Sequence, residues 1–422
     1  MRNKDRRRSK HAIALAAAST LICLLAAACS SADGDSTAGE GALGTIPPDS
    51  PSPAKSTLTF GSISADTGPV ILSSIADGTE AWARYVNTHG GIGGHPVKIV
   101  RCDDGLDATK NQDCARRLIQ DTSVLAVIGG ETVVTPLVAA PLLNQAGLSY
   151  LSTETTGEGE MKGPAMFAIT GGAITQFAAL AKHFPANGAK KVALVNAAST
   201  SSSKAAARTT EEVKAAGGSV VATVFAKPGT PDYSPVATQL LSANPDVIFT
   251  GVTPTDLPAL VRAIRQQNPT VKIATLASQW PATTVKTLGD TKDGLYMATD
   301  WAAFPDDSAD PDITAMRVML HRMGRQASFG QGSMSGWLGG RAMEAAIAGM
   351  KDDKITRAGL TAHLRAATLT VKGVPVPLTL PKGSAPGGYD GLANPSAYIN
   401  QWKGDDLKQV ALVRDVFAPA GG

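Results

Sequence analysis

The stretch VLAVI at residues 124–128 decides the fold, because it is a short and almost continuous apolar run. Such a run is typical of a strand in a parallel sheet, where helices cover both faces. Amphipathic segments at 111–120 and 134–146 lie on either side of it and have the spacing of helices. A further strand is predicted at 149–152. Strand and helix therefore alternate, which predicts an α/β fold with a parallel sheet.

The same alternation extends outward in both directions. Before this stretch, strands are predicted at 58–63 and 97–100 and a helix at 75–87. After Gly171 and Gly172 the pattern restarts, with strands at 191–195, 219–225, 247–249 and 272–276 and helices at 203–216, 235–243 and 257–267. Two such units in tandem predict two doubly wound parallel-sheet lobes. Because ligands of open α/β sheets lie beyond the carboxyl ends of the strands, we expect a cleft between the lobes that is lined by strand-end loops.

The charge of the chain does not favour a nucleic-acid partner. The net charge is +3 at pH 7, but the first ten residues hold the cations Arg2, Lys4, Arg6, Arg7, Arg8 and Lys10. The rest of the chain is close to neutral, and no basic patch interleaved with aromatic residues remains. We therefore expect a small-molecule ligand and no nucleic acid.

Residues 1–28 have the pattern of a signal peptide. The basic segment is followed by an apolar stretch at 12–28, which is short for a membrane span and ends in small residues. The sequence LAAAC at 25–29 resembles a lipobox, in which Cys29 would be acylated, although the usual Leu three places before the cysteine is Ala26 here. A secretory signal cleaved near Ala28 without lipidation is the alternative.

Residues 29–56 are predicted to form a tether. The stretch from Ser30 to Ala54 is rich in Ser, Gly, Asp and Pro, a composition that cannot bury a core. A lipid on Cys29 would hold the protein at the extracytoplasmic face of the cell membrane.

Two of the four cysteines are left for the folded part of the chain. Cys23 leaves with the signal peptide, whereas Cys102 and Cys114 stand at a strand end and in the first turns of a helix. Outside the cytoplasm such a pair persists as a disulfide, which the chain-entropy model values at roughly 2–3 kcal/mol. A metal site is the alternative, but the histidines are scattered and no His-Glu-x-x-His pattern is present. We therefore expect no metal and no cofactor.

Several motifs occur in an order that resembles a known family. YVNTHGGIGG at 85–94 precedes a strand and CDDGLD at 102–107, and further matches are LIQD at 118–121, GAKKVALV at 188–195, DYSP at 232–235 and ANPDVIF at 243–249. Together they resemble the leucine/isoleucine/valine-binding type of periplasmic substrate-binding protein, which serves ABC transporters. The similarity covers residues 57 to 412. The glycines between helix and strand permit a tight turn, and their order is the reverse of a dinucleotide-binding loop.

The resemblance implies the type I periplasmic binding protein fold, in which the chain crosses between the lobes three times. Lobe I would comprise residues 57–171 and 299–381, and lobe II residues 172–298 and 382–418. Crossings of this kind form a hinge whose closure buries the ligand.

In relatives that bind amino acids, the first lobe holds the ligand carboxylate with hydroxyl and backbone N–H groups. The resemblance places Thr132 and Thr135 in one such loop and Thr153, Glu154 and Thr156 in another. Hydroxyl groups at strand ends suit the polar or anionic head of a ligand. The alternative is that these threonines only satisfy the backbone of their own turns.

The second lobe departs from the family pattern. Ser201 stands where a tyrosine is expected, and a second tyrosine is missing near Thr253. The acid that would bind a ligand ammonium is replaced by Gln279, a neutral amide, beside Trp280. Because an unpaired buried ammonium is unfavourable, we do not expect a standard branched-chain amino acid as the ligand.

Other positions complete the set of candidates for ligand binding. Ser73 replaces an aromatic residue in the first loop, and Glu131 or Glu154 could supply the missing acid from the opposite lobe. Trp280 and Trp301 could stack on a ligand, although tryptophan more often packs in a core.

The sequence therefore predicts a binding protein that captures a small polar molecule, such as an amino acid or a related compound, for an ABC importer. A ligand sensor that signals to a membrane partner is the alternative. A secreted serine hydrolase is a remote one, because GSMSG at 332–336 has Met334 at the nucleophile position. Ser201 and Lys204 have Ser-x-x-Lys spacing without the companion motifs. We therefore predict that the protein is not an enzyme.

Overall fold

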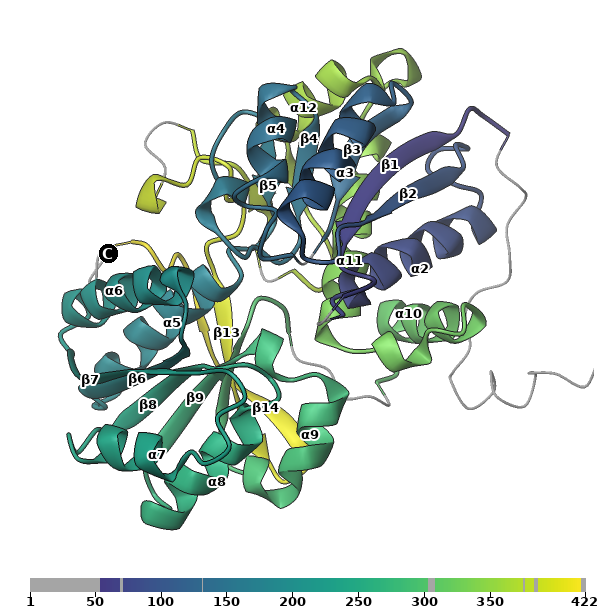
Figure 1. Ribbon diagram of the computed structural model, residues 1–422. Helices are drawn as coiled ribbons and strands as arrows, with labels where there is room; N and C mark the ends of the chain where they lie inside the picture. The colour runs from purple at the N-terminus through teal and green to yellow at the C-terminus, as the bar shows by residue number, and fades with distance from the viewer. Residues whose placement is uncertain are drawn as a thin grey trace, which may run out of the picture.

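Two separate sheets, both dominated by parallel strands, organise the chain (Figure 1). The structure is a computed structural model that describes residues 54–68, 71–130, 132–302, 308–374, 376–382 and 386–418. The predicted signal peptide, Cys29 and nearly all of the predicted tether lie outside these residues. An α/β fold with parallel-dominated sheets confirms the fold class that the alternating pattern predicts.

The first sheet has five strands, all parallel, in the order β2-β1-β3-β4-β5. They are β1 (Leu58–Ser64), β2 (Val97–Asp103), β3 (Val124–Ile128), β4 (Ser149–Ser152) and β5 (Met166–Ala168). The helices between them are α2 (Ser74–Thr88), α3 (Ala108–Gln120) and α4 (Ala139–Gln145). Every residue of β1 is buried, as expected for a strand covered on both faces.

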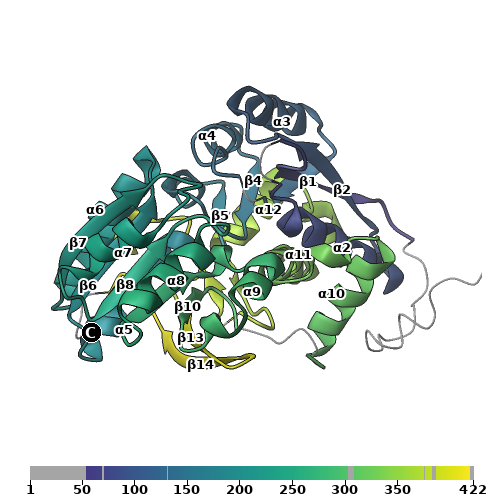
Figure 2. The same ribbon diagram turned by 60° about the horizontal axis from the view of Figure 1, so that its bottom comes forward.

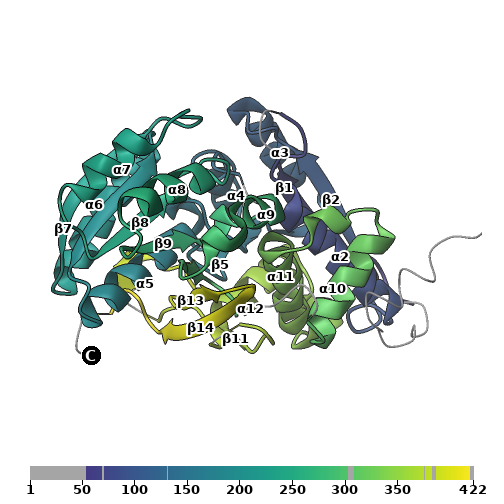
Figure 3. The same cartoon turned by 90° about the horizontal axis from the view of Figure 1, so that it is seen from below.

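The second sheet has seven strands in the order β14-β13-β10-β9-β8-β6-β7. Its parallel part contains β6 (Lys191–Ala197), β7 (Ser219–Ala226), β8 (Val247–Gly251), β9 (Lys272–Leu276) and β10 (Tyr296–Thr299). The C-terminal strands β13 (Ala397–Lys403) and β14 (Asp406–Val413) join it in antiparallel fashion, at the edge farthest from β7 (Figure 3). The helices of this half are α5 (Ala173–Ala186), α6 (Thr200–Ala215), α7 (Ser234–Leu241), α8 (Leu257–Gln267) and α9 (Ala282–Leu288).

The chain returns to the first half after β10. Helices α10 (Pro311–Arg322) and α11 (Gln331–Ala348) pack on α2, and α12 (Arg357–Ala366) packs on β3 and β4. The short strands β11 (Thr368–Leu369) and β12 (Leu378–Thr379) pair with each other before the chain enters β13. The chain thus passes between the halves after β5, after β10 and before β13.

Hydrogen bonds connect the first and third of these crossings. The Ala168 amide donates to the Gly391 carbonyl at 2.7 Å, and the Ala393 amide donates to the Ala168 carbonyl at 2.8 Å. Residues 389–393 therefore lie along β5, at the edge of the first sheet. We propose on this ground that the third passage lies close to Asn394.

The helix after β3 differs most from its predicted bounds. The sequence predicts a helix at 134–146, whereas α4 begins at Ala139 and residues 132–138 form turns. Pro141 explains the difference, because proline has no N–H to donate inside a helix but is tolerated in a first turn. Beginning the helix at Ala139 places Pro141 in that first turn.

Cys102 at the end of β2 and Cys114 in α3 form a disulfide, with their Cα atoms 5.7 Å apart. Both side chains are buried in the core cluster between β1, β3 and α3. The bond therefore ties α3 to the first sheet.

Candidate functional site

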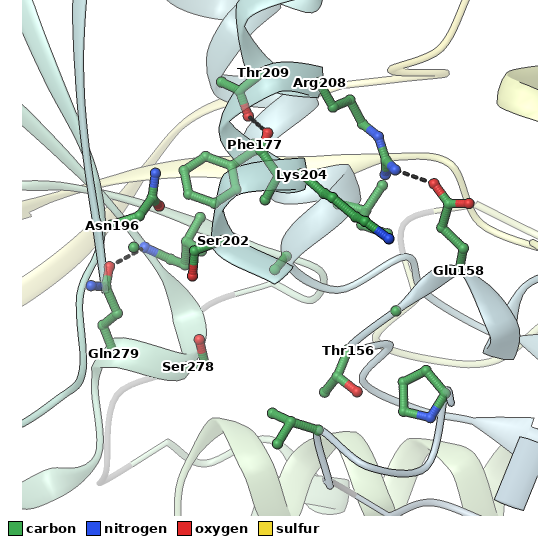
Figure 4. Close-up of a pocket in the computed structure, with 18 of the residues that line it drawn as sticks. Thr156, Glu158, Phe177, Asn196, Ser202, Lys204, Arg208, Thr209, Ser278 and Gln279 are labelled. Atoms are coloured by element: carbon green, nitrogen blue, oxygen red, sulfur yellow. Dashed lines mark hydrogen bonds and ion pairs between the residues drawn. The ribbon is translucent and has the colours of Figure 1, made fainter. Parts of the chain in front are cut away.

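A cleft of about 590 Å³ lies between the two halves of the molecule (Figure 4). Its first wall comes from residues 133–137, before α4, and from residues 156–159, after β4. Its second wall comes from α5, α6 and the loops that follow β6, β8 and β9. The segment before α4 and helix α6 thus face each other across the cleft (Figure 2). A cleft of this size has room for one small organic molecule.

The second wall lies at the carboxyl ends of three neighbouring parallel strands. Asn196 is the next-to-last residue of β6, Gly251 ends β8 and Leu276 ends β9, and all three line the cleft. The carboxyl edge of a parallel sheet is where ligands of open α/β folds bind. A Cβ at Gly251 would lie 2.1 Å from the Asn196 side-chain oxygen, so glycine lets this side chain pack against β8.

Two cationic side chains project from α6 into the cleft. Lys204 and Arg208 are four residues apart and therefore lie on the same face of the helix. Figure 4 shows both reaching toward the side of the cleft where Glu158 and Thr156 lie. Lys204 is exposed and has no ion-pair partner within the described part of the chain.

Arg208 forms an ion pair with Glu158 of the first half, and this pair spans the cleft. Glu158 also accepts hydrogen bonds from Lys162 Nζ at 2.8 Å and from Tyr389 Oη at 3.2 Å. Lys162, followed by Arg208, lowers the pKa of the Glu158 carboxyl below its usual value. Glu158 therefore stays ionised, and its charge offsets that of Arg208.

Glu212 lies one helical turn beyond Arg208 and also lines the cleft. Its Oε2 atom is buried and has no hydrogen-bond partner among the described residues. Burial raises the pKa of this carboxyl to about 7, although the nearby charges of Arg208 and Lys182 act in the opposite direction. Glu212 is therefore divided between its neutral and ionised forms near pH 7.

The first wall is apolar where it faces these charges. Val133 and Leu137 are 63% and 80% exposed and offer apolar surface to the cleft. Both line the cleft, together with Pro136. Ile174 and Phe177 of α5 add an apolar surface on the second wall.

Glu160 forms hydrogen bonds that hold the loop of residues 156–159 in the first wall. Its carboxylate accepts the Thr156 N–H at 2.7 Å and the Gly157 N–H at 3.2 Å. Tyr150 Oη donates to the same carboxylate at 3.0 Å. Glu160 is almost fully buried, and this burial raises its pKa to about 7 despite the hydrogen bonds that it accepts.

Thr156 and Gln279 are the two predicted ligand-binding residues whose side chains line the cleft. The Thr156 hydroxyl donates to the Thr132 carbonyl at 3.2 Å. The Gln279 oxygen accepts from the Thr250 hydroxyl and the Leu276 amide, both at 2.9 Å, and its nitrogen donates to the Val252 carbonyl. Gln279 therefore links the loops after β8 and β9.

The other predicted residues of the first half that the structure describes are not among the residues that line the cleft. Thr132 and Thr135 are buried and bonded to each other, with their hydroxyl oxygens 2.9 Å apart. Thr153 is buried against α11, and Glu154 is half-buried outside the lining. Ser73 donates to Asp77 at 3.3 Å at the start of α2. Glu131 lies outside the described residues.

The predicted residues of the second half stabilise its fold. The Thr253 hydroxyl donates to the Asp256 carboxylate at 2.6 Å, at the start of α8. Trp280 donates to Thr275 at 2.7 Å and packs on Trp402, with the ring centres 5.3 Å apart. Trp301, by contrast, is buried in the core of the first half and donates to Ser335 of α11 at 2.7 Å. Ser201 lies in the first turn of α6. The roles of these residues in ligand binding stay predictions.

Several lining residues that the sequence did not predict lie on the helices of the second half. Lys204, Arg208 and Glu212 are spaced four apart on one face of α6, and Phe177 belongs to α5. The i, i+4 spacing of two cations after a strand-end serine run was the signal in the sequence. This spacing is equally typical of a solvent-exposed helix face, and only the position of the opposite half of the molecule distinguishes the two.

Residues 57–406 match the protein family described as periplasmic binding protein, so the chain belongs to this family. The match covers most of the chain and confirms the resemblance that the motifs indicate. Members of this family bind solutes outside the cytoplasm and are not enzymes, and the same holds for this chain.

A curated relative and several solved structures are similar to this chain. An amino acid binding protein from Pseudomonas aeruginosa is 24% identical over 217 residues, a match that covers 49% of this chain and 57% of the relative. A leucine-binding protein from Thermotoga maritima has 18% identity and a TM-score of 0.67, covering 85% of this chain and 99% of that one. A solute-binding protein of an ABC transporter from R. palustris, in complex with 4-hydroxybenzoate, has 20% identity and a TM-score of 0.68, covering 87% and 99%. The structural matches show the fold.

Two further observations concern the described ranges only. No helix in them combines the length and the hydrophobicity needed to cross a membrane. No group of three or more His, Cys, Asp or Glu side chains in them is arranged to hold a metal ion.

Proposed function

We propose that this protein captures a small solute in the cleft between its halves and delivers it to an ABC importer. The observation that carries the proposal is the cleft itself, which is lined from both halves and lies at the carboxyl ends of β6, β8 and β9. Three passages of the chain between the halves suit a hinge that opens and closes over a ligand. The relatives named above that bind leucine, amino acids or 4-hydroxybenzoate support this proposal.

The proposed anchoring rests on the sequence of the N-terminus. Acylation of Cys29 after removal of residues 1–28 would attach the protein to the membrane, with the following segment as a tether. Mass spectrometry of the protein from its native membrane tests this point. We expect a lipid-modified N-terminal cysteine, and an unmodified N-terminus near Cys29 would support simple secretion instead.

Among the predicted ligand-binding residues, we propose that Thr156 and Gln279 border the bound solute. The cleft residues of α5 and α6 complete the site. The hydroxyl groups of Thr132, Thr135 and Thr253 form hydrogen bonds within their own turns, which supports a role for these three residues in shaping the loops.

A thermal-shift screen of residues 57–418 tests the proposed function. A solute that binds the folded state raises the melting temperature in a concentration-dependent way. The panel should contain amino acids, carboxylic acids, amides, amines and sugars. We expect at least one class to shift the transition, and a panel in which no compound does so would argue against the function.

A further inference from the structure

The charged groups of the cleft are divided unequally between its two walls. Lys204, Arg208 and Glu212 belong to the second wall, whereas the first wall contributes one charged side chain, Glu158, which is paired with Arg208, and the apolar side chains of Val133 and Leu137. We propose that the cleft selects solutes with a single anionic group and an apolar body. The anionic group would be bound by Lys204 and Arg208 of α6, and the body would pack against the first wall. This inference rests on the proposed function, because it names the class of solute for the same site.

The first wall is poorly suited to bind an anion. The N–H groups of Thr156 and Gly157 point to the buried carboxylate of Glu160 and are used by it. The Thr156 hydroxyl is also engaged, by the Thr132 carbonyl. A second anion at this loop would lie close to the carboxyl group of Glu160, which disfavours it.

The second wall supplies the positive charge. Lys204 has no ion-pair partner in the described residues, so its ammonium group is available to a solute. Arg208 is paired with Glu158, but a guanidinium group has five N–H donors and can bind a second anion beside the first. Because the two side chains are one helical turn apart, they can bind the same carboxylate.

Apolar side chains on both walls of the cleft can pack against the apolar part of the solute. Val133 and Leu137 are exposed on the first wall, where covering them would remove apolar surface from water. Ile174 and Phe177 line the cleft from α5 and offer a second apolar contact. A solute with an aliphatic chain or a ring can therefore contact apolar side chains from both walls.

Among the described residues, the cleft has no group well placed for an α-ammonium. The oxygen of Gln279 is used by Thr250 and by the Leu276 amide. Glu158 is already paired with Arg208 and Lys162. Glu212 lines the cleft but is partly neutral near pH 7, and its Oε2 atom is buried. A zwitterionic amino acid would therefore leave its ammonium unpaired next to two cations, which disfavours it relative to the simple acid.

Matched solutes separate these contributions. Isocaproate, its amide and leucine share one aliphatic body, and phenylpropanoate, its amide and phenylalanine share one ring-bearing body. We expect calorimetric titration to show that the acid of each set binds about tenfold or more tightly than its amide and its amino acid, as a charge-assisted hydrogen bond implies. The same comparison applies to any acid found in the broader screen.

Variants of α6 provide the second arm of the experiment. Lys204→Ala should weaken binding of the acid about tenfold and leave binding of the amide almost unchanged. Lys214→Ala is the matched control, because Lys214 is exposed on the same helix and does not line the cleft. It should bind like the wild type.

The outcomes distinguish the inference from the function on which it rests. If amides or amino acids bind as tightly as their acids, or if Lys204→Ala binds acids like the wild type, the inference is overturned while the receptor function stands. If no compound of any charge class binds the wild type, the proposed function fails, and the inference fails with it.

Discussion

Glu160 stabilises the conformation of the Thr156 loop in the first wall of the cleft. A carboxyl group that accepts two backbone N–H groups of the Thr156 loop holds that loop in one conformation. Its burial makes the ionised form unfavourable, although the hydrogen bonds to Tyr150 and to the loop reduce this penalty. The shape of the cleft is thus coupled to a titratable group that the solute does not touch.

The stability of the protein should reflect this buried carboxyl group. Its pKa rises from 4.5 to about 7 on folding, so its contribution is fully present below about pH 4.5 and is lost as the pH rises through about 7. We expect Glu160→Gln to reduce the loss of stability between pH 4.5 and pH 8 by on the order of 3 kcal/mol. Urea unfolding of both proteins at the two pH values measures this difference. Parallel pH profiles would show that Glu160 does not titrate as its burial implies.

Solute affinity should depend on pH through Glu212. This group is neutral below about pH 7 and ionised above, and Arg208, Lys182 and Tyr389 are the titratable groups around it. An anionic solute should therefore bind severalfold more weakly at pH 8 than at pH 6, because the ionised Glu212 repels it. Glu212→Gln should remove this dependence in titrations at the two pH values. If the affinity of the wild type for the anionic solute rises with pH, the expected fall in affinity is contradicted.

At the residue scale the sequence predicted only part of the cleft. Thr156 and Gln279 line the cleft and lie in the loops that follow β4 and β9, which are positions that the strand-end rule names. The side chains of α5 and α6 were not found, because whether a helix face meets solvent or a cleft depends on the distant segment opposite. The hydroxyl groups of Thr132 and Thr135 are hydrogen-bonded to each other, and the role of these residues in ligand binding stays a prediction.

Among the elements, α2 and α11 pack unusually closely. Gly332, Gly336 and Gly340 are spaced four apart on α11, and a Cβ at each would lie within 2.3 Å of an atom of α2. On α2, a Cβ at Gly78 would lie 1.9 Å from the Ser333 carbonyl oxygen. Two of these glycines also frame the GSMSG sequence, so their role there is packing between helices.

Widening this contact should destabilise the first half. A Cβ at Gly336 would lie 1.9 Å from the backbone oxygen of Ile75, which cannot move without shifting α2. We expect Gly336→Ala to lower the free energy of unfolding by about 2 kcal/mol or more, although alanine is the better helix former. Ala348→Ser adds one atom at an exposed position of the same helix and should change stability by less than about 0.5 kcal/mol. Urea unfolding compares the two, and equal stabilities would show that the helices can separate freely.

The regular elements with strong apolar runs were predicted well. The bounds of β3, β4, β9 and α8 agree with the sequence pattern, since each is a short run closed by polar or turn residues. The strands β5 and β10 and helix α5 were not predicted. β5 and β10 have only three and four residues, and α5 is apolar on nearly all sides. None of the three therefore gives a clear hydrophobic periodicity in the sequence.

For the whole molecule, the hinge region couples the crossings to the cleft. Asp300 follows β10 and accepts from Gln176 Nε2 at 2.7 Å and Thr175 Oγ1 at 3.0 Å, both at the start of α5. Gln176 in turn accepts the Ala277 amide at 3.0 Å in the loop that borders the cleft. These hydrogen bonds connect the crossing after β10 to one wall of the cleft.

The central claim is that a solute occupies the space between the halves, and obstructing that space tests it most directly. Ala205 lines the cleft on α6, whereas Ala207 is exposed on the same helix outside the lining. Calorimetric titration with the best solute should give equal affinity for the wild type and Ala207→Trp, and a loss of about a hundredfold or more for Ala205→Trp, because the indole would fill the site. Equal affinity of all three proteins would contradict binding in the cleft.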